Sequence, residues 1–186
     1  MCIRDSPHTV TVFDFGRTEE GEPYLAMEYC EGGALSDRIA VDGALPAVEV
    51  VSLLAGITAA VDAAHRQGIV HRDLKPGNIL FAGAVAKVAD FGLARMLESD
   101  DPGLTGGHAI GSPFYMSPEQ CQGRPAGTAS DIYSLGVIVY TLLTGEVPFR
   151  RGTAQEVLLA HLTEEPRPPQ AIAPHLGSAL SRAVMR

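Results

Sequence analysis

Apolar positions near the start of the chain fall in two short runs of β-prone residues. These runs cover residues 10–15 and 24–29, and a charged segment that begins with Gly16, residues 16–23, separates them. Two such runs joined by a short polar segment predict a β-hairpin. Apolar runs at residues 79–81 and 85–88 predict further short strands.

Helical spacing of apolar positions follows the first hairpin. It predicts one or two turns at residues 35–40 and a longer helix from Pro46 to Gly68, with proline in the first turn and glycine at the stop. Residues 131–143 are apolar almost all round, which predicts a buried helix. An amphipathic helix is expected at residues 153–162 and another from residue 176, with an irregular linker at 166–174.

Residues 90–119 show no sustained periodicity of apolar positions, and a loop of about thirty residues in a compact domain is usually functional.

The length and composition of the chain indicate one domain. The chain has 186 residues, of which 46% are hydrophobic and 19% charged, enough to bury a core and too apolar for a disordered segment.

Charge and cysteine content narrow the class of protein. A net charge of −8 argues against a sequence-independent nucleic-acid binder, and none is expected as a partner. The three cysteines are Cys2, Cys30 and Cys121; they form no CxxC pair, so neither a disulfide framework nor a zinc site is expected and a reducing cytoplasm fits better.

A membrane span and a signal peptide are both unexpected within this chain. The richest apolar stretch, residues 132–143, is shorter than the roughly 20 residues that a span needs. The first six residues have no apolar region after them and match nothing downstream, so we interpret them as a non-native start.

The decisive motif lies at residues 71–80, which read HRDLKPGNIL. This segment matches the pattern H-R-D-L-x-x-x-N. Asp90-Phe91-Gly92 begins 17 residues after Asp73, and residues 117–119 read Ser-Pro-Glu where Ala-Pro-Glu is usual. In this order and spacing, the motifs resemble those of protein kinases.

The resemblance implies an α+β protein-kinase-like fold, with a mainly helical C-lobe (residues 31–186) and the last strands and hinge of the N-lobe (residues 7–30). A small-molecule phosphotransferase of the aminoglycoside-kinase type shares the H-x-D-x-x-x-x-N loop. That alternative lacks the combination of Glu119 with Asp131 and is disfavoured.

Phosphoryl transfer gives each residue of the motif a role, because catalysis consists mostly of positioning and neutralising charge. By resemblance, Asp73 accepts and orients the substrate hydroxyl. Asn78 and Asp90 offer the oxygen ligands that Mg²⁺ prefers. Lys75 is a counter-charge to the γ-phosphate of ATP, and lysine at this place is typical of serine/threonine kinases.

Other motif residues are expected to be architectural. By resemblance, His71 stacks on Phe91 in a hydrophobic spine that Val12 also joins. Asp131, 12 residues beyond Glu119, resembles the buried helix aspartate that anchors the backbone of the His-Arg-Asp loop.

Residues 24–33, YLAMEYCEGG, resemble the strand and hinge that hold adenine. By resemblance, Met27 guards the back of the pocket, the backbone of Glu28 and Cys30 binds adenine, and Leu80 forms the floor. Asp37 either reaches a ribose hydroxyl or has a helix-capping or solvent-exposed role, and the second reading is favoured.

Residues 111–119, here called the docking segment, resemble the stretch that receives the peptide substrate. Ser112 stands where the family has a threonine, and Glu119 belongs to the same segment. Arg72 places a guanidinium beside Asp73, and in the family such an arginine is usually neutralised by a phosphate. We expect Thr105, between Gly92 and the docking segment, to carry that phosphate.

Parts of the kinase pattern are absent. No G-x-G-x-x-G-x-V loop or V-A-I-K lysine stands before Val10, and the arginine partner of Glu119 would lie beyond Arg186. The resemblance covers residues 7–186, so the chain is expected to be a fragment that is inactive alone, with hinge residues 27–30 exposed. The alternative is a catalytically inactive, kinase-like binding or scaffold module.

The sequence is rich in Ala and Gly and contains Pro-Glu-Gln at residues 118–120 and LTGEVPF at residues 143–149. In these features it most resembles bacterial, eukaryotic-like (Hanks-type) serine/threonine kinases. The resemblance implies Mg-ATP, protein substrates bearing Ser or Thr, self-association for autophosphorylation, and a cytoplasmic kinase domain. Many of these kinases carry a membrane span after that domain.

Overall fold

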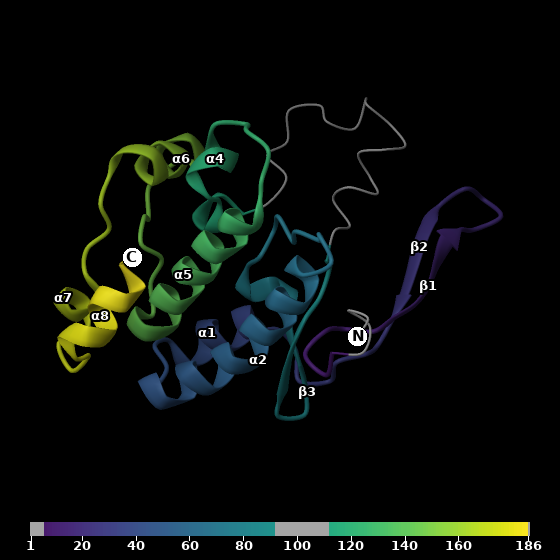
Figure 1. Ribbon diagram of the computed structural model, residues 1–186, viewed down its shortest axis with the longest axis horizontal. Coiled ribbons are helices and arrows are strands. Elements are labelled where there is room, and N and C mark those ends of the chain that lie inside the picture. Colours follow the sequence, from purple (N-terminus) through teal and green to yellow (C-terminus); the bar gives the residue numbers. More distant parts are fainter. Residues whose placement is uncertain (1–5, 92–111, 186) are drawn as a thin grey trace.

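The computed structural model describes residues 6–91 and 112–185, and mixes helices with two small sheets (Figure 1). Its first half contains β1 (Val12–Arg17), β2 (Pro23–Met27), α1 (Leu35–Asp42), α2 (Ala47–His65), the 3-10 turn η2 (Pro76–Asn78), β3 (Ile79–Ala82) and β4 (Val85–Val88). Its second half contains the 3-10 turn η3 (Pro113–Tyr115), α4 (Pro118–Cys121), α5 (Thr128–Thr144), α6 (Ala154–Thr163), α7 (Pro169–Ile172) and α8 (Ser178–Val184).

Strands β1 and β2 form the expected antiparallel hairpin, which extends away from the helical body (Figure 1). The register pairs Val12 with Met27 and Arg17 with Pro23, with an irregularity between Val12 and Asp14. Because the hairpin packs on little else, Phe13 and Phe15 are 70% and 55% exposed. Val12 is half-buried and belongs to neither hydrophobic cluster, so the structure does not place it in a spine.

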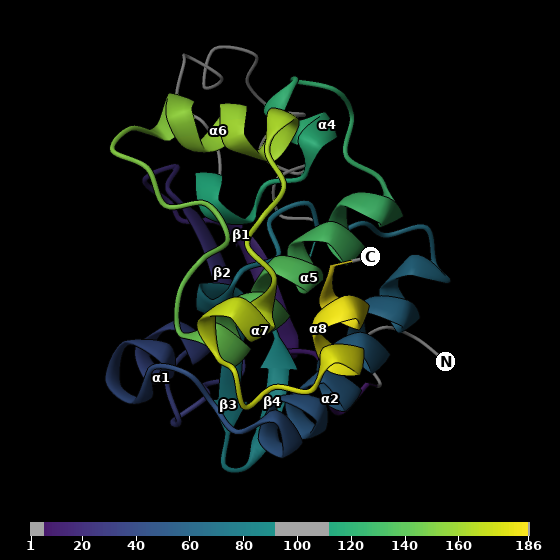
Figure 2. The same ribbon diagram turned by 90° about the vertical axis from the view of Figure 1, so that its left-hand side faces the viewer.

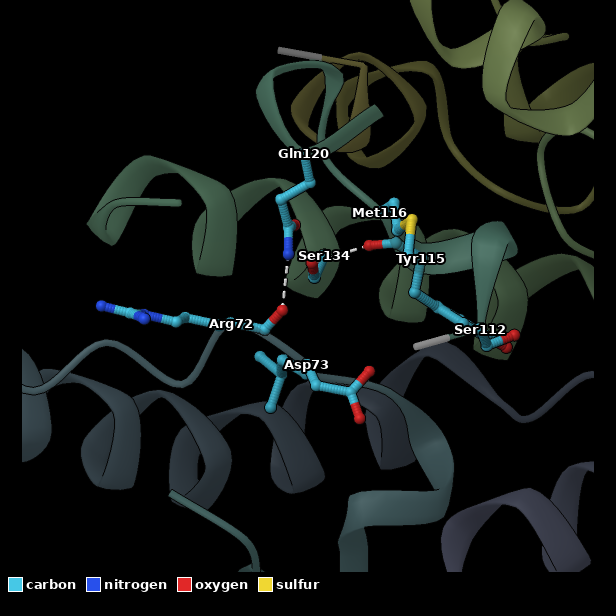
Figure 3. Close-up of a pocket in the computed structure, with 8 residues that line it drawn as sticks. Arg72, Asp73, Ser112, Tyr115, Met116, Gln120 and Ser134 are labelled. Carbon is cyan, nitrogen blue, oxygen red and sulfur yellow. Dashed lines mark hydrogen bonds between the residues drawn. The ribbon is translucent and has the colours of Figure 1, made fainter. Parts of the chain in front are cut away.

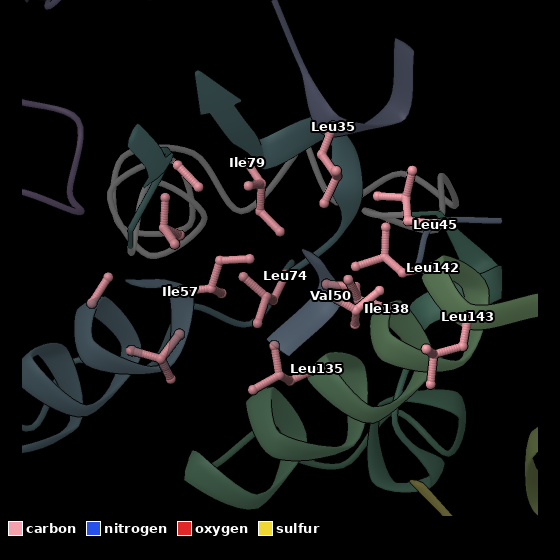
Figure 4. Packing of buried hydrophobic residues seen from close by; sticks show 14 of the residues in the cluster. Leu35, Leu45, Val50, Ile57, Leu74, Ile79, Leu135, Ile138, Leu142 and Leu143 are labelled. Carbon is pink, nitrogen blue, oxygen red and sulfur yellow. The ribbon is translucent and has the colours of Figure 1, made fainter. Parts of the chain in front are cut away.

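Helices α2 and α5 meet in the main hydrophobic core (Figure 4). Both helices contribute aliphatic side chains, and so do the loop that carries the kinase motif and strand β3. The cluster includes Leu35, Val50, Ile57, Leu74, Ile79, Leu135, Ile138 and Leu142. The core therefore joins both halves of the chain and includes Leu74 of the loop that carries the kinase motif.

Helix α2 is longer than the apolar stretch at 132–143, which lies inside α5. Helix α2 has 19 residues, and an 18-residue window of it has a mean hydropathy of 1.7, so it is long and apolar enough to cross a membrane by length and composition. Its Val50, Ile57 and Val61 are buried, and it packs on α5 and β4, as the core helix of a globular domain does.

The second half of the chain surrounds α5 (Figure 2). The Tyr133 hydroxyl lies 2.7 Å from His161 Nδ1 of α6, and the Tyr140 hydroxyl donates to the Arg167 carbonyl 2.9 Å away. The expected irregular linker at 166–174 contains α7, a single helical turn with proline at its start. The linker prediction was therefore wrong for residues 169–172.

Candidate active site

The catalytic loop, residues 71–78, is anchored by Asp131 in the first turn of α5. Asp131 is 1% exposed, and its Oδ2 accepts the His71 N–H at 2.8 Å while its Oδ1 accepts the Arg72 N–H at 2.9 Å. A buried carboxylate is stable only when its oxygens are hydrogen-bonded. Two successive loop amides meet that need, so the contact expected for Asp131 is present.

His71 is buried against the segment that carries Asp90. Its Nε2 lies 2.8 Å from the Ala89 carbonyl, and its Nδ1 accepts the Asp73 N–H at 3.3 Å. A carbonyl can only accept, so Nε2 carries the proton and the ring is neutral. Burial lowers the pKa of His71, which also favours the neutral ring. The ring centroids of His71 and Phe91 are 4.9 Å apart, and Phe91 packs against the main core.

Asp73 lies at the centre of a small polar network. Lys75 Nζ is 2.6 Å from Asp73 Oδ2, and Asn78 Nδ2 donates to the Asp73 carbonyl at 2.8 Å and to Oδ2 at 3.3 Å. The side chains of Lys75 and Asp73 are 28% and 30% exposed, so solvent and substrate can reach them. The network therefore holds the Asp73 carboxylate, a hydrogen-bond acceptor, beside the positively charged Lys75 side chain, and solvent reaches both.

Asn78 and Asp90 fit an oxygen-preferring cation. Asn78 commits its NH₂ group to Asp73, which leaves its Oδ1 for a ligand. The Ala89 N–H donates to the Asn78 carbonyl at 2.8 Å. The exposed Asp90 directly follows Ala89, so this bond holds its backbone close to that of Asn78. Among residues 6–91 and 112–185, no three His, Cys, Asp or Glu side chains cluster around a metal position. A bound cation would therefore take further ligands from phosphate or water.

Backbone geometry marks two of these positions. Arg72 and Asp90 have φ of 70° and 61°, the only positive values among the described residues other than glycine. A residue other than glycine keeps a left-handed backbone conformation only where the surrounding structure constrains it, and such residues often occur at functional sites. Arg72 also takes part in a further interaction within the chain, so it is not without a partner.

The hinge candidates divide between surface and interior. Met27 is 37% exposed, whereas Cys30 is 8% exposed and packs with Val10 and Ala89, and Leu80 packs against the same cluster. The expectation that residues 27–30 are all exposed is thus wrong for Cys30. The contact of Leu80 with this cluster puts the candidate floor residue beside the hinge.

Glu28 is fixed by a half-buried ion pair. Lys87 Nζ lies 2.8 Å from Glu28 Oε1, and the Thr11 N–H donates to Glu28 Oε2 at 3.2 Å. The hydrogen bond from Lys87 lowers the pKa of Glu28. The Glu28 N–H donates to the Thr11 carbonyl at 2.8 Å, and within the described chain the Glu28 carbonyl and the Cys30 N–H have no partner. Glu28 and Cys30 are the two residues whose backbone is expected, by resemblance, to bind adenine.

The docking segment meets the catalytic loop in a small pocket. Figure 3 shows its lining: Arg72, Asp73, Leu74, Ser112, Tyr115, Met116, Gln120 and Ser134. Ser112 therefore shares a pocket with Asp73. Thr105 lies outside the described residues. Sequence reasoning missed the role of Gln120, whose Nε2 donates to the Arg72 carbonyl at 2.6 Å.

The Glu119 side chain forms a hydrogen bond with the nearby start of α5. Its Oε1 accepts the hydroxyl of Ser130 at the start of α5, and this bond lowers the pKa of Glu119. The charge of Arg124 adds to the effect. Asp37 accepts the Ala34 N–H at 3.1 Å, which is the favoured capping role.

Comparisons with known proteins agree with the geometry. The protein kinase domain profile matches residues 2–178. The chain is 39% identical over 190 residues to the serine/threonine-protein kinase pkn3 of Myxococcus xanthus, covering 97% of this chain and 35% of the relative. It is 38% identical over 182 residues to the probable serine/threonine-protein kinase PknB of Bifidobacterium longum, covering 92% and 26%.

A third relative, the serine/threonine-protein kinase PknB of Mycobacterium tuberculosis, is 37% identical over 185 residues, covering 97% of this chain and 30% of the relative. The chain thus spans about a third or less of the length of these curated relatives. The expected fold class and the resemblance to bacterial serine/threonine kinases are confirmed. This chain belongs to the protein kinase family.

Proposed function

We propose that this chain is part of a longer protein kinase that transfers the γ-phosphate of Mg-ATP to serine or threonine in protein substrates. The observation that carries the proposal is the Asp73 carboxylate, bonded to Lys75 and Asn78 and sharing a pocket with Ser112 of the docking segment. An acceptor carboxylate that lines the pocket, with a lysine bonded to it, suits hydroxyl activation and γ-phosphate neutralisation.

Each residue has a definite task in this proposal. Asp73 accepts a hydrogen bond from the substrate hydroxyl, orients the oxygen toward phosphorus, and takes its proton as transfer proceeds. Lys75 moves from Asp73 Oδ2 toward the γ-phosphate oxygens. Asn78 Oδ1 and Asp90 hold Mg²⁺, which neutralises phosphate charge when bound. The backbone of Glu28 and Cys30 pairs with adenine, with Leu80 beneath it and Met27 behind.

A longer protein is supported by two observations. Curated relatives extend well beyond this chain, which covers 26–35% of the three compared above. The hairpin also exposes Phe13 and Phe15, which a neighbouring segment would cover. The proposal includes a cytoplasmic kinase domain in bacterial signalling, with self-association for autophosphorylation.

Phosphorylation of Thr105 is the proposed means of regulation. A phosphate carries about −1.5 to −2 charges and forms strong hydrogen bonds to arginine, so a phosphate on Thr105 would be a suitable partner for the Arg72 guanidinium. Phosphosite mapping together with the activity of Thr105→Ala tests this point. An unphosphorylated Thr105 and full activity of the alanine variant would reject it.

The test of the main proposal compares Asp73→Asn with the unsubstituted full-length protein. The variant keeps the shape of the side chain and loses the proton acceptor, so phosphate transfer to a serine peptide should fall by at least about 10²-fold. Nucleotide affinity, measured by calorimetry, should remain. Asp62→Asn, on the exposed surface of α2, is the matched control. Wild-type turnover by Asp73→Asn would contradict the role of Asp73. Nucleotide binding without transfer by the unsubstituted protein would instead favour the scaffold alternative.

A further inference from the structure

The peptide group that joins Arg72 to Asp73 is held at both ends by side chains. Gln120 Nε2 donates to its carbonyl at 2.6 Å, and its N–H donates to His71 Nδ1 at 3.3 Å. Arg72 adopts φ of 70°, a conformation that a side-chain-bearing residue keeps only under external constraint. The orientation of the backbone entering Asp73 therefore depends in part on Gln120 of α4 (Figure 3).

The Gln120 amide uses both of its ends. Its Oε1 accepts the Ser117 N–H at 3.1 Å and the Ser117 hydroxyl at 3.0 Å, while its Nε2 faces Arg72. Ser117 is fully buried and forms the capping box of α4 with Gln120. Capping requires only an acceptor, which glutamate supplies as well as glutamine. The bond to Arg72 requires a donor, so helix capping alone does not explain the amide.

This side chain therefore ties the docking segment to the catalytic loop. Ser117 belongs to the docking segment, and Asp73 and Ser112 line the same pocket as Gln120. A peptide must rest on the docking segment while its hydroxyl reaches Asp73. Misplacement of reacting groups by about 1 Å can cost about 10²-fold in rate, so the separation of these two segments matters.

We infer that Gln120 is a positioning residue for phosphate transfer to peptides, holding the docking segment and the Arg72–Asp73 peptide group in one fixed arrangement. Gln120 acts through Arg72 and Ser117 and touches neither nucleotide nor substrate hydroxyl. The inference rests on the proposed function and adds a determinant of how the peptide is presented to Asp73.

Two substitutions in the full-length protein separate capping from positioning. Gln120→Glu keeps the acceptor for Ser117 and, when ionised, loses the donor to Arg72; Gln120→Met loses both. At pH 8, both should lower kcat/KM for a serine peptide by about tenfold, the scale of one lost hydrogen bond. KM for ATP should not change, because Gln120 contacts none of the candidate nucleotide residues. Gln122→Glu and Gln122→Met, at the exposed C-cap position of α4, are the matched controls.

The pH dependence of activity separates positioning from a purely structural role for Gln120, because a structural role predicts no change in the relative activity of the two variants with pH. A protonated glutamate regains a donor, so the activity of Gln120→Glu relative to Gln120→Met should rise as the pH falls from 8 to 5. The rise should be about two- to threefold at pH 5, where about a sixth of an ordinary glutamate side chain is protonated, and about tenfold at most once protonation is complete. Groups around position 120 also titrate or carry charge, and both variants share them, so the ratio removes their effect. They are Arg72, Asp73, Tyr115, Glu119 and Asp131.

The outcomes are distinct. Wild-type kcat/KM in both Gln120 variants, or a ratio that stays constant with pH, overturns the inference and leaves the proposed function intact. No transfer by the unsubstituted protein overturns the proposed function and this inference with it. A tenfold loss in both variants with pH-dependent recovery in Gln120→Glu alone supports the inference.

Discussion

The carboxylate of Asp131 lies 2.7 Å from Nε2 of His65, the last residue of α2. The same carboxylate accepts the backbone N–H groups of His71 and Arg72. One side chain from α5 thereby joins a second core helix to the catalytic loop. Its loss should affect stability and loop geometry together.

Asp131→Asn tests this junction. The amide offers one oxygen in place of two, so either the His71 or the Arg72 N–H must face an NH₂ group and lose its acceptor. A buried donor without a partner costs about 1–3 kcal/mol, which we expect as the fall in the free energy of unfolding. Urea denaturation measures the loss, and hydrogen exchange should become faster at these two amides. The exposed control Asp62→Asn should cost less than about 0.5 kcal/mol. Unchanged exchange at both amides would contradict the anchoring role.

Stability should fall as the pH drops below about 6.5. Burial lowers the pKa of His71 and of His161, so the unfolded chain binds protons that the folded chain resists. The stability is therefore complete above the unfolded pKa of histidine and is lost as the pH falls toward the folded pKa, at up to about 1.4 kcal/mol per unit for each group. The lowered pKa values of Glu28 and Glu119 add a similar loss below about pH 4.5.

His161→Gln isolates one contribution. Glutamine does not titrate, and its oxygen can still accept the Tyr133 hydroxyl that now bonds to His161 Nδ1. The difference in unfolding free energy between pH 7.5 and pH 5.5 should be smaller in this variant than in the unsubstituted chain. Equal differences would show that His161 does not contribute to the acid sensitivity.

Local elements were predictable where the sequence has a clear period. The strand at Val85–Val88 has the expected bounds, and residues 131–143 lie inside α5 as a buried helix. Helix α7 was missed because a four-residue turn in a proline-rich stretch shows no periodicity, although proline at its start is compatible with a helix. By resemblance, Val12 was expected to join the hydrophobic spine of His71 and Phe91. In the structure the hairpin that contains Val12 does not pack into the main hydrophobic core.

The candidate site was predictable to the extent that a local motif names its residues. The types and spacing of Asp73, Lys75 and Asn78 are read from eight positions of sequence. The bond from Gln120 to Arg72 joins residues 48 positions apart and depends on how α4 meets the loop. No local pattern indicates such a contact. The left-handed backbone of Arg72 was also unexpected, because arginine has no preference for that conformation.

Gly32 is required where the hinge crosses β3. A Cβ at Gly32 would lie 2.6 Å from Phe81 Cβ and 2.9 Å from the Phe81 carbonyl oxygen, so the backbone would have to shift. The Gly32 N–H also donates to that carbonyl at 2.9 Å. We expect Gly32→Ala to lower the free energy of unfolding by about 1–3 kcal/mol, the usual cost of overpacking. Thermal and urea unfolding measure the loss.

Gly136 provides the contrasting substitution. It lies inside α5, and among the described residues no atom outside the local helix backbone lies within 4 Å of a Cβ built there. Gly136→Ala should raise the free energy of unfolding by about 0.5–1 kcal/mol, because alanine restricts the unfolded chain and favours the helix. If Gly32→Ala were as stable as Gly136→Ala, the close approach of hinge and β3 would not be a constraint.

In the longer protein that we propose, the exposed aromatic side chains of the hairpin should become buried. Phe13 and Phe15 are 70% and 55% exposed, and Tyr29 is 84% exposed, more apolar surface than a short hairpin carries without a covering partner. In residues 6–185 alone, Phe13→Ser with Phe15→Ser should change the free energy of unfolding by less than about 0.5 kcal/mol per site and reduce binding of a hydrophobic dye. In the full-length protein the same pair should cost about 3 kcal/mol or more, because buried phenylalanines are lost. Val41→Ser with Val48→Ser, at positions 85% and 80% exposed on the helical body, should have small effects in both contexts. Equal and small losses from the phenylalanine pair in the two proteins would show that no further segment covers the hairpin.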